Sequence, residues 1–245
     1  MMKMDRLIIA TDIDGTLTDR NYILNLEAVD ILRKLSKRGA IVVLVSSHAY
    51  AAVSTLGEYL GFRYVVGETG ACGGFPWRPL FVEEIPSMDE IVSLLVNNGF
   101  KVAESNRFRL ADISLWPIDN DVNASRQLLE LILKDFNVDI FYSGFAFHIV
   151  KKGVNKGRGL LRLLEKTGIS GRIIAIGDGE NDVPLFSVAD FSIAPADAPD
   201  ILKRTATVVT CYDGFISTLF VLKNIEKLFK FRKFNLEILK KLLEK

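Results

Sequence analysis

Apolar positions along the chain follow two alternating patterns. Short, largely apolar runs rich in β-branched residues occur at 7–10, 41–45, 64–66, 173–176 and 191–193. Other segments carry apolar residues at helical spacing, at 26–35, 49–60 and 156–167. Apolar strands separated by helices are typical of a parallel sheet that is covered on both faces. We therefore predict an α/β fold with a Rossmann-like, doubly wound parallel sheet as its core.

The pattern changes in the middle of the chain. Ser87, with Glu90 three residues later, predicts a capping box at the start of a helix, and a second helix is predicted over 124–136. Alternating positions predict strands at 112–115, 139–142 and 145–150. Ser143 and Gly144 are expected to form the turn between the last two strands. This order of helices and half-buried strands indicates an α+β cap that is inserted into the core.

The chain is expected to divide into three parts. These are a core from 1–80 and 153–220, a cap from 81–152, and a tail from 221–245. The tail carries eight basic and three acidic residues, and an apolar helical face includes Phe220, Ile225, Leu228 and Phe229. We predict a helix that packs on the core and leaves its basic face in solvent. Contact with a partner or a membrane surface is the alternative, and a homodimer is a further hypothesis.

The composition is that of an ordinary globular protein. Hydrophobic residues make up 49% and charged residues 25%, and the formal net charge of +1 gives no indication of a nucleic-acid partner. Cys72 and Cys211 form neither a Cys-x-x-Cys motif nor a disulfide framework, as is typical of a reducing compartment. No apolar run reaches the roughly 18 residues of a membrane span, and the first is too short for a signal peptide. We therefore expect a cytoplasmic protein.

Two carboxylates directly follow the first predicted strand. Asp12 and Asp14 are two positions apart, so both side chains can face one pocket, and Gly15 allows the chain to turn. One carboxylate can attack phosphorus and form an aspartyl-phosphate. The other can protonate the leaving alkoxide and later activate water. Taken alone, the stretch is equally typical of a turn without chemistry.

A second acidic cluster follows the predicted strand at 173–176, and it contains Asp178, Glu180 and Asp182. The carboxyl ends of parallel strands open on one edge of a sheet, so we expect both clusters at one crevice. Acidic groups repel unless a cation lies between them, which favours a hard ion such as Mg2+. Neither cluster matches an EF-hand, and neither a Walker A sequence nor a complete G-x-G-x-x-G is present.

Two further residues have the chemistry of a phosphate site. Ser46 follows the predicted strand at 41–45, where its hydroxyl and the next helix's amides can bind phosphate oxygens. Lys156 begins a predicted helix, where its ammonium can neutralise a nucleophile and a phosphoryl group. Taken alone, such a serine is usually a helix cap and such a lysine is usually solvated. Their order with the two acidic clusters favours the phosphate site.

In order and type these residues resemble the four motifs of the haloacid dehalogenase superfamily of phosphatases. The motifs are Asp12-Ile13-Asp14-Gly15-Thr16, Ser46, Lys156 and Gly177-Asp178-Gly179-Glu180-Asn181-Asp182. The resemblance extends to about residue 220 and implies the haloacid dehalogenase fold, with a C2-type cap as in the Cof-like, sugar-phosphatase branch. The segments 143–148 and 154–157 look especially like archaeal phosphoglycolate phosphatases.

The resemblance also implies a role for each motif residue. Asp12 is the nucleophile, and Asp14 is the general acid/base whose backbone carbonyl also faces Mg2+. Asp178 is a metal ligand, while Asp182 holds the metal directly or through water, or orients Lys156. The residues that grip or support the phosphoryl group are Ser46, Lys156 and Asn181. These roles agree with the chemistry, because phosphoryl transfer mostly needs positioning and charge neutralisation.

Two loops depart from the family pattern. The chain has Ser47-His48 where relatives commonly carry Gly-Asn, and Glu68-Thr69-Gly70 where many have an Asn before the glycine. Both loops border the pocket in the family, so they bear on substrate preference. We expect His48 to pack or cap rather than contact substrate. For His148, which faces away from its strand neighbours, a substrate-facing role and a structural role are both open.

These observations predict a Mg2+-dependent phosphatase that acts on a small phosphorylated metabolite. The expected substrate is 2-phosphoglycolate, and the cap is expected to close over it and exclude bulk water. The alternatives are a sugar-phosphate or mannosyl-3-phosphoglycerate phosphatase, and a phosphomutase that returns the phosphoryl group to a bound sugar. A phosphate sensor is the non-enzymatic alternative, although binding alone does not need both Asp12 and Asp14.

Overall fold

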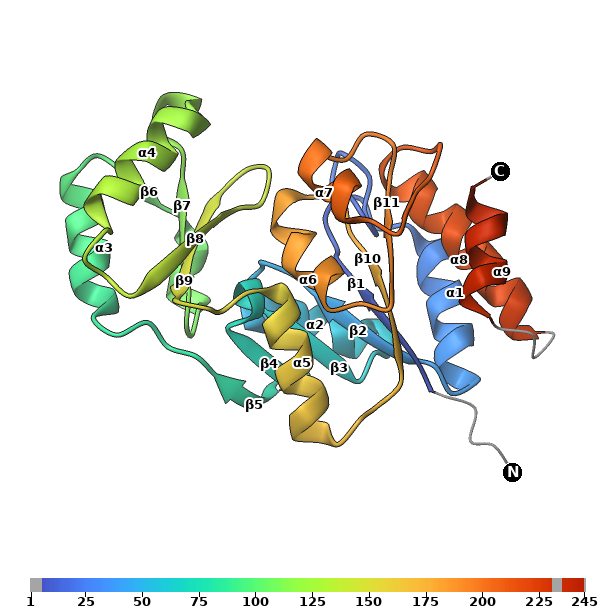
Figure 1. The fold of residues 1–245 in the computed structure, drawn as a ribbon. Helices are drawn as coiled ribbons and strands as arrows, with labels where there is room; N and C mark the ends of the chain where they lie inside the picture. Colours follow the sequence, from blue (N-terminus) through green and yellow to red (C-terminus); the bar gives the residue numbers. More distant parts are fainter. Residues whose placement is uncertain (1–5, 231–234, 245) are drawn as a thin grey trace.

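Eight strands form the larger of two sheets in the computed structural model, which describes residues 6–230 and 235–244 (Figure 1). Their order in the sheet is β12-β11-β10-β1-β2-β3-β4-β5. The strands are β1 (Leu7–Thr11), β2 (Ile41–Val45), β3 (Tyr64–Gly67), β4 (Cys72–Phe75), β5 (Arg78–Val82), β10 (Arg172–Ile176), β11 (Phe191–Ala194) and β12 (Val208–Val209). Those from β12 to β3 run parallel, which confirms the predicted core, and β4 and β5 add an antiparallel hairpin.

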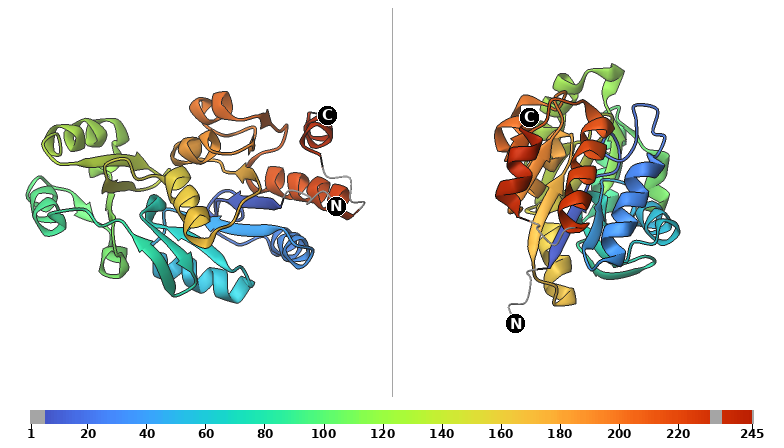
Figure 2. Two further views of the ribbon diagram at one scale, coloured as in Figure 1. Left: turned by 60° about the horizontal axis from the view of Figure 1, so that its bottom comes forward. Right: turned by 90° about the vertical axis from the view of Figure 1, so that its right-hand side faces the viewer.

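Helices cover both faces of this sheet because its central strands are apolar on both sides. In β1, Leu7 and Ile9 pack into one buried cluster, and Ile8 and Ala10 pack into the other. The first face is covered by α1 (Leu26–Lys37), α2 (Tyr50–Leu60), α8 (Gly214–Lys230) and α9 (Leu236–Leu243). The second face is covered by α5 (Lys156–Thr167), α6 (Val183–Ser187) and α7 (Asp200–Thr205). Figure 2 shows these two helical layers with the sheet between them.

A second, antiparallel sheet lies in the insert between β5 and α5. Its order is β6-β7-β9-β8, with β6 (Lys101–Val102), β7 (Ile113–Trp116), β8 (Val138–Tyr142) and β9 (Phe147–Lys151). The helices α3 (Met88–Asn97) and α4 (Val122–Ile132) pack on it through a separate buried cluster. They lie on the outer side of the cap, and the sheet lies toward the core (Figure 1). The predicted α+β cap is therefore confirmed, while the boundaries expected at 81 and 152 remain a prediction.

The predicted capping box at the start of α3 is wrong. Ser87 precedes the helix, but its backbone is left-handed, with φ of 62°, and its side chain makes no capping hydrogen bond. A capping residue needs extended backbone to direct its side chain at the first-turn amides. The next helix, α4, is capped instead by Asp121, whose side chain accepts from the amide of Ala124.

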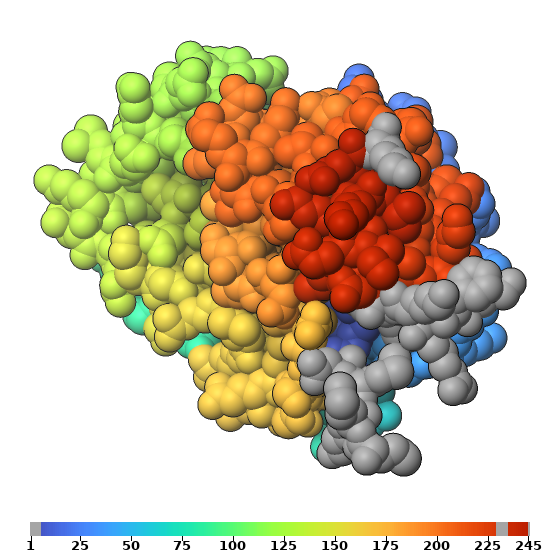
Figure 3. All heavy atoms as spheres, turned by 45° about the vertical axis from the view of Figure 1, so that its right-hand side comes forward, coloured from blue at the N-terminus to red at the C-terminus, as the bar shows by residue number. Residues whose placement is uncertain are grey.

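The C-terminal tail packs on the core, as the apolar face predicts. Helix α8 runs across the expected tail boundary at 221, and α9 follows it. The apolar tail-face residues in or against the core cluster include Phe220, Ile225, Leu228, Leu239 and Leu243, while the Phe229 side chain lies outside the described residues. Figure 3 shows α9 lying against α8 on the outer surface. Neither these helices nor any other in the described chain is long and apolar enough to cross a membrane.

Candidate active site

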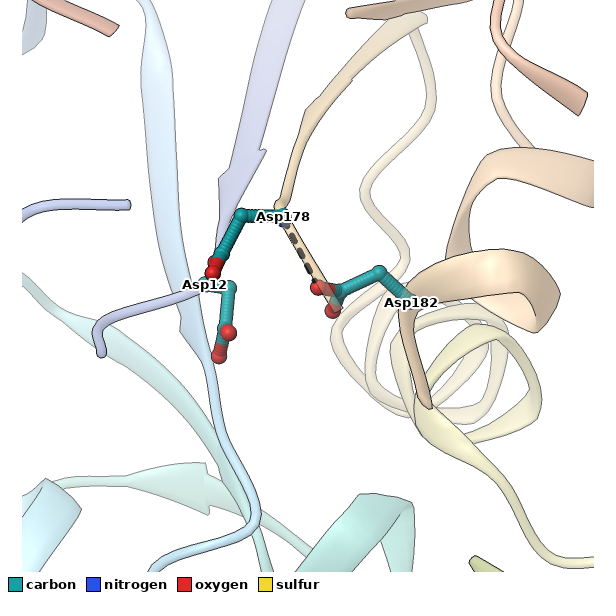
Figure 4. Close-up of side chains that lie close together, drawn as sticks. All are labelled: Asp12, Asp178 and Asp182. Carbon is teal, nitrogen blue, oxygen red and sulfur yellow. Dashed lines mark hydrogen bonds between the residues drawn. The ribbon is translucent and has the colours of Figure 1, made fainter. Parts of the chain in front are cut away.

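The two acidic stretches meet at the carboxyl edge of the larger sheet, as the predicted topology requires. Strands β1 and β10 are parallel neighbours, and the amide of Asp12 donates to the carbonyl of Ile176 at 2.9 Å. Figure 4 shows Asp12, Asp178 and Asp182 converging from adjacent loops. One carboxylate oxygen of each lies within 4.8 Å of the other two.

Lys156 is buried between two of these carboxylates. It is the first residue of α5, whose start is capped by Asn155 accepting from the amide of Arg158 at 2.9 Å. Its Nζ lies 2.9 Å from Asp12 Oδ1 and donates to Asp182 Oδ1 at 2.6 Å, and the side chain is 0% exposed. A solvated lysine, the alternative at this position, is therefore excluded.

Hydroxyl and amide donors hold Asp178 and the second oxygen of Asp182. Thr16 Oγ1 donates to Asp178 Oδ1 at 2.6 Å, and Asp182 Oδ2 accepts from the amides of Asp178 and Gly179 at 3.1 and 3.0 Å. Both oxygens of Asp182 are therefore bound within the protein. Gly15 has φ of 72°, and a Cβ there would lie 2.2 Å from Asp178 Oδ2. The turn thus needs glycine both for its conformation and for space.

Burial and repulsion raise the pKa values of two carboxyl groups. Burial raises the pKa of Asp12 well above its usual range, and Asp182 adds to this while Lys156 opposes it. Burial and the charge of Asp182 raise the pKa of Asp178 to about 7, against the hydrogen bond from Thr16. Burial alone would lower the pKa of Lys156, but Asp12 and Asp182 reverse the effect and keep the pKa raised. One ammonium thus faces three carboxylates, and the site lacks positive charge.

This donor set fits a hard divalent cation. Carboxylate oxygens are the ligands that Mg2+ prefers, and a cation would supply the charge that the site lacks. Within the described chain, no hydrogen bond reaches Asp12 Oδ2 or Asp178 Oδ2, whereas both oxygens of Asp182 are engaged. The acidic triad could thus hold a divalent cation, with Asp12 Oδ2 and Asp178 Oδ2 as the free ligand atoms.

The loop after β2 reaches the same edge of the sheet. Ser46 is 1% exposed, its amide donates to the carbonyl of Val66 at 2.9 Å, and its Oγ accepts from the amide of His48 at 3.1 Å. Within the part of the chain that the structure describes, the hydroxyl hydrogen of Ser46 has no acceptor, so it is available to an anion. Asn181 Nδ2 donates to Ser47 Oγ at 3.0 Å, so it joins this loop to the second acidic loop. Sequence reasoning did not predict that contact.

The expectation that His48 packs or caps is wrong. Its Nε2 lies 2.8 Å from Asp14 Oδ2, and the two side chains are 43% and 23% exposed. The physical reason is that the loop after β2 lines a pocket at this point, and the residue before α2 is Ala49 rather than His48. The structure thus brings His48 against the predicted general acid/base.

A buried carboxylate of the core holds the entry to cap strand β7. Glu68 follows β3 and is 0% exposed. Its carboxylate accepts from the amide of Tyr50 in the core and from those of Leu110, Ala111 and Asp112 in the cap, at 2.7 to 3.3 Å. Burial and the nearby Asp112 raise the pKa of Glu68, while the amide hydrogen bonds oppose that rise. The sequence marked this residue only as a departure from the family pattern.

Two cap arginines also reach the loops of the site. Arg109 Nη1 donates to the carbonyl of Ser47 at 3.0 Å, and Arg126 Nη2 donates to Glu180 Oε2 at 3.2 Å. Sequence reasoning missed both, because neither pairing is local: each depends on how the cap lies over the core.

His148 is buried and held by partners within the cap, as a structural role requires. It is 1% exposed, with Nδ1 3.2 Å from Asp112 Oδ2 and Nε2 3.1 Å from Ser143 Oγ. Burial lowers its pKa, although the hydrogen bond with Asp112 opposes this. Both ring nitrogens are therefore used within the cap.

The capped α/β fold and the acidic site beside a buried lysine are those of a phosphatase, an enzyme that transfers a phosphoryl group to water. A family model described as haloacid dehalogenase-like hydrolase matches residues 9–103 and 87–213, and the chain belongs to that family. The phosphoglycolate phosphatase of Archaeoglobus fulgidus is 34% identical over 206 residues, which cover 82% of this chain and 89% of the relative.

Two further comparisons agree with this assignment. The phosphoglycolate phosphatase of Methanopyrus kandleri is 30% identical over 208 residues, covering 82% of this chain and 89% of the relative. Among solved structures, a Thermoplasma acidophilum protein superposes with a TM-score of 0.78 and 26% identity, over 93% of this chain and 99% of that one.

Proposed function

We propose that this phosphatase uses Mg2+ to hydrolyse 2-phosphoglycolate to glycolate and phosphate through an aspartyl-phosphate. The observation that carries the mechanism is the position of the buried Lys156, whose Nζ lies 2.9 Å from Asp12 Oδ1. The other oxygen, Asp12 Oδ2, accepts no hydrogen bond from the described residues, so it is free to attack. The archaeal phosphoglycolate phosphatases at 30% and 34% identity support the choice of substrate.

In the first half of the reaction, Asp12 attacks phosphorus and the bond from phosphorus to the ester oxygen breaks. Lys156 orients the nucleophile and neutralises charge on the phosphoryl oxygens, and the Ser46 hydroxyl donates to one of them. Asp14, within reach of His48, gives its proton to the glycolate oxygen as it leaves. In the second half, Asp14 takes a proton from water, which attacks phosphorus and releases Asp12.

The remaining site residues act by positioning. Asp182 holds Lys156 at 2.6 Å, and Asn181 holds the loop of Ser46 through Ser47. Asp12, Asp178 and the backbone carbonyl of Asp14 would hold Mg2+, which supplies positive charge for the phosphoryl oxygens when bound. The cap contacts at Glu68 and Arg126 keep the site covered, which reduces the access of bulk water.

One observation favours a larger leaving group as the second candidate. A pocket of about 410 Å³ lies between cap and core, and Trp116 and Phe145 contribute to its lining. This volume is within the usual range of sites for drug-sized ligands and exceeds what glycolate needs. A sugar phosphate or mannosyl-3-phosphoglycerate is therefore the alternative substrate.

Phosphate release from 2-phosphoglycolate, several sugar phosphates and a generic aryl phosphate, with and without Mg2+, tests the proposal. We expect Mg2+-dependent release with the highest kcat/KM for 2-phosphoglycolate. A higher value for a sugar phosphate would replace the substrate but retain the mechanism. An isomerised ester without free phosphate would indicate a mutase, and full activity of Asp12→Asn would refute the nucleophile.

A further inference from the structure

The pocket between cap and core begins beside the predicted phosphoryl site. Its core wall includes Ser47 and His48, and its cap wall includes Ser105, Arg109 and His148. Ser47 lies directly between Ser46 and His48 in the chain, and consecutive Cα atoms are about 3.8 Å apart. A leaving group on the Ser46 side of the phosphoryl site is therefore next to this pocket.

Arg109 is a buried cation in the wall of this pocket, and its side chain is 4% exposed. Nη1 donates to the Ser47 carbonyl at 3.0 Å and to the two oxygens of Asp112 at 2.6 and 2.8 Å. Nε donates to Ser105 Oγ at 3.3 Å. Nη2 donates to no acceptor in the described chain, so its two N–H groups remain for a molecule in the pocket.

The contacts of Arg109 fix the guanidinium before any ligand arrives. Asp112 is 1% exposed and is itself held by His148 and by the amide contact with Glu68. A planar guanidinium that is already oriented and desolvated binds a carboxylate with little further ordering cost. The two histidines of the pocket wall are otherwise engaged, His48 with Asp14 and His148 at both ring nitrogens.

We infer that Arg109 is a specificity residue that binds the carboxylate of the leaving group, so that the enzyme selects phosphate esters of hydroxycarboxylic acids. The inference rests on the proposed phosphatase function and adds the residue that recognises the leaving group. Nη2 is the donor, and the Ser47 carbonyl ties the guanidinium to the loop of the phosphoryl site. In 2-phosphoglycolate one methylene separates the ester oxygen from the carboxylate, and in 3-phosphoglycerate two carbons do. 2-Phosphoglycolate and mannosyl-3-phosphoglycerate thus both carry the group that Arg109 would bind, whereas a simple sugar phosphate does not.

Matched ester pairs test this assignment. The pairs are 2-phosphoglycolate with 2-hydroxyethyl phosphate, and 3-phosphoglycerate with glycerol 3-phosphate; in each, an alcohol replaces the carboxylate. We expect the wild-type protein to favour at least one carboxylate ester by about 10- to 100-fold in kcat/KM, the usual worth of a hydrogen bond between charged groups. Arg109→Gln should bring that ratio close to one while it retains hydrolysis of the alcohol ester. Arg107→Gln, an exposed neighbour with a 64% exposed side chain, should leave the ratio unchanged.

A purely structural role of Arg109 would change both members of a pair alike. Because Arg109→Gln leaves the Asp112 charge buried without its partner, the double variant Arg109→Gln/Asp112→Asn is measured beside it. A wild-type preference that persists in a folded variant, or no carboxylate preference in an active wild-type enzyme, overturns the inference and leaves the phosphatase function intact. Absence of phosphate release from all four esters and from an aryl phosphate overturns the proposed function itself.

Discussion

Replacing Asp178 by Asn is expected to stabilise the metal-free protein and to remove its stabilisation by Mg2+. Burial and the charge of Asp182 raise the pKa of Asp178 from the ordinary 3.8 to about 7. An acid with a raised pKa in the folded state loses stability as pH rises from its unfolded value through its folded value. The penalty is therefore absent near pH 3, grows between about pH 4 and 7, and is complete above pH 7.

The size of the effect follows from the shift. A pKa change of about three units, at 1.36 kcal/mol per unit, corresponds to a stability penalty of about 4 kcal/mol at pH 8. This is an upper value, because the neighbouring acids share the penalty. Asn keeps an oxygen that can accept from Thr16 Oγ1, so the fold loses no hydrogen bond there. In the wild-type protein, Mg2+ at 100 times its Kd should add about 2.7 kcal/mol. Mg2+ should stabilise the Asp178→Asn variant much less, because an amide replaces the carboxylate that offers one of the two free ligand oxygens.

Urea unfolding followed by circular dichroism, at pH 5 and 8 and with EDTA or Mg2+, measures both effects. The exposed Asp200, 84% exposed in its side chain, provides the control: Asp200→Asn should change stability by less than about 0.5 kcal/mol. The reasoning is refuted if Asp178→Asn destabilises the metal-free protein at pH 8. It is equally refuted if Mg2+ stabilises the variant and the wild-type protein to the same extent.

Three further perturbations probe the site and its cover. Asp12→Asn should lower kcat for any phosphate ester by at least about a thousandfold without unfolding the protein; single-turnover phosphate release measures this, and a loss confined to KM would contradict the nucleophile. Lys156→Ala should cost about 3 to 5 kcal/mol, because the buried Asp12 and Asp182 lose their cation, and an unchanged urea midpoint would argue against that network. Glu68→Gln should cost about 1 to 3 kcal/mol, because an amide replaces one oxygen that accepts from the cap backbone. Faster amide hydrogen exchange at residues 110–112 is the specific effect expected of this change, and unchanged exchange there would contradict the role of Glu68 in holding the cap backbone.

The sequence by itself determined the core strands, one helix and the sheet edge at which the acidic residues lie, because these depend on local pattern and on sheet geometry. Apolar runs predicted β1, β2, β3 and β10 because a strand buried on both faces must be apolar throughout. Asp12 and Asp178 were expected at one edge because the carboxyl ends of parallel strands open together. The helix predicted at 156–167 begins and ends at those residues, where Asn155 caps the first turn and Gly168 ends the last in a left-handed conformation.

Only the tertiary structure decided which distant groups complete the site. Glu68, Arg109 and His48 have side chains whose partners lie in other elements, and no local spacing predicts a contact between residues 68 and 111 or 47 and 109. The capping box at Ser87 was wrong because the spacing of Ser87 and Glu90 does not show that the backbone of Ser87 is left-handed. Local pattern thus predicted the acidic residues and the lysine that meet at the sheet edge. The packing of cap on core decided what surrounds them, since side-chain partners depend on distances that only the folded chain sets.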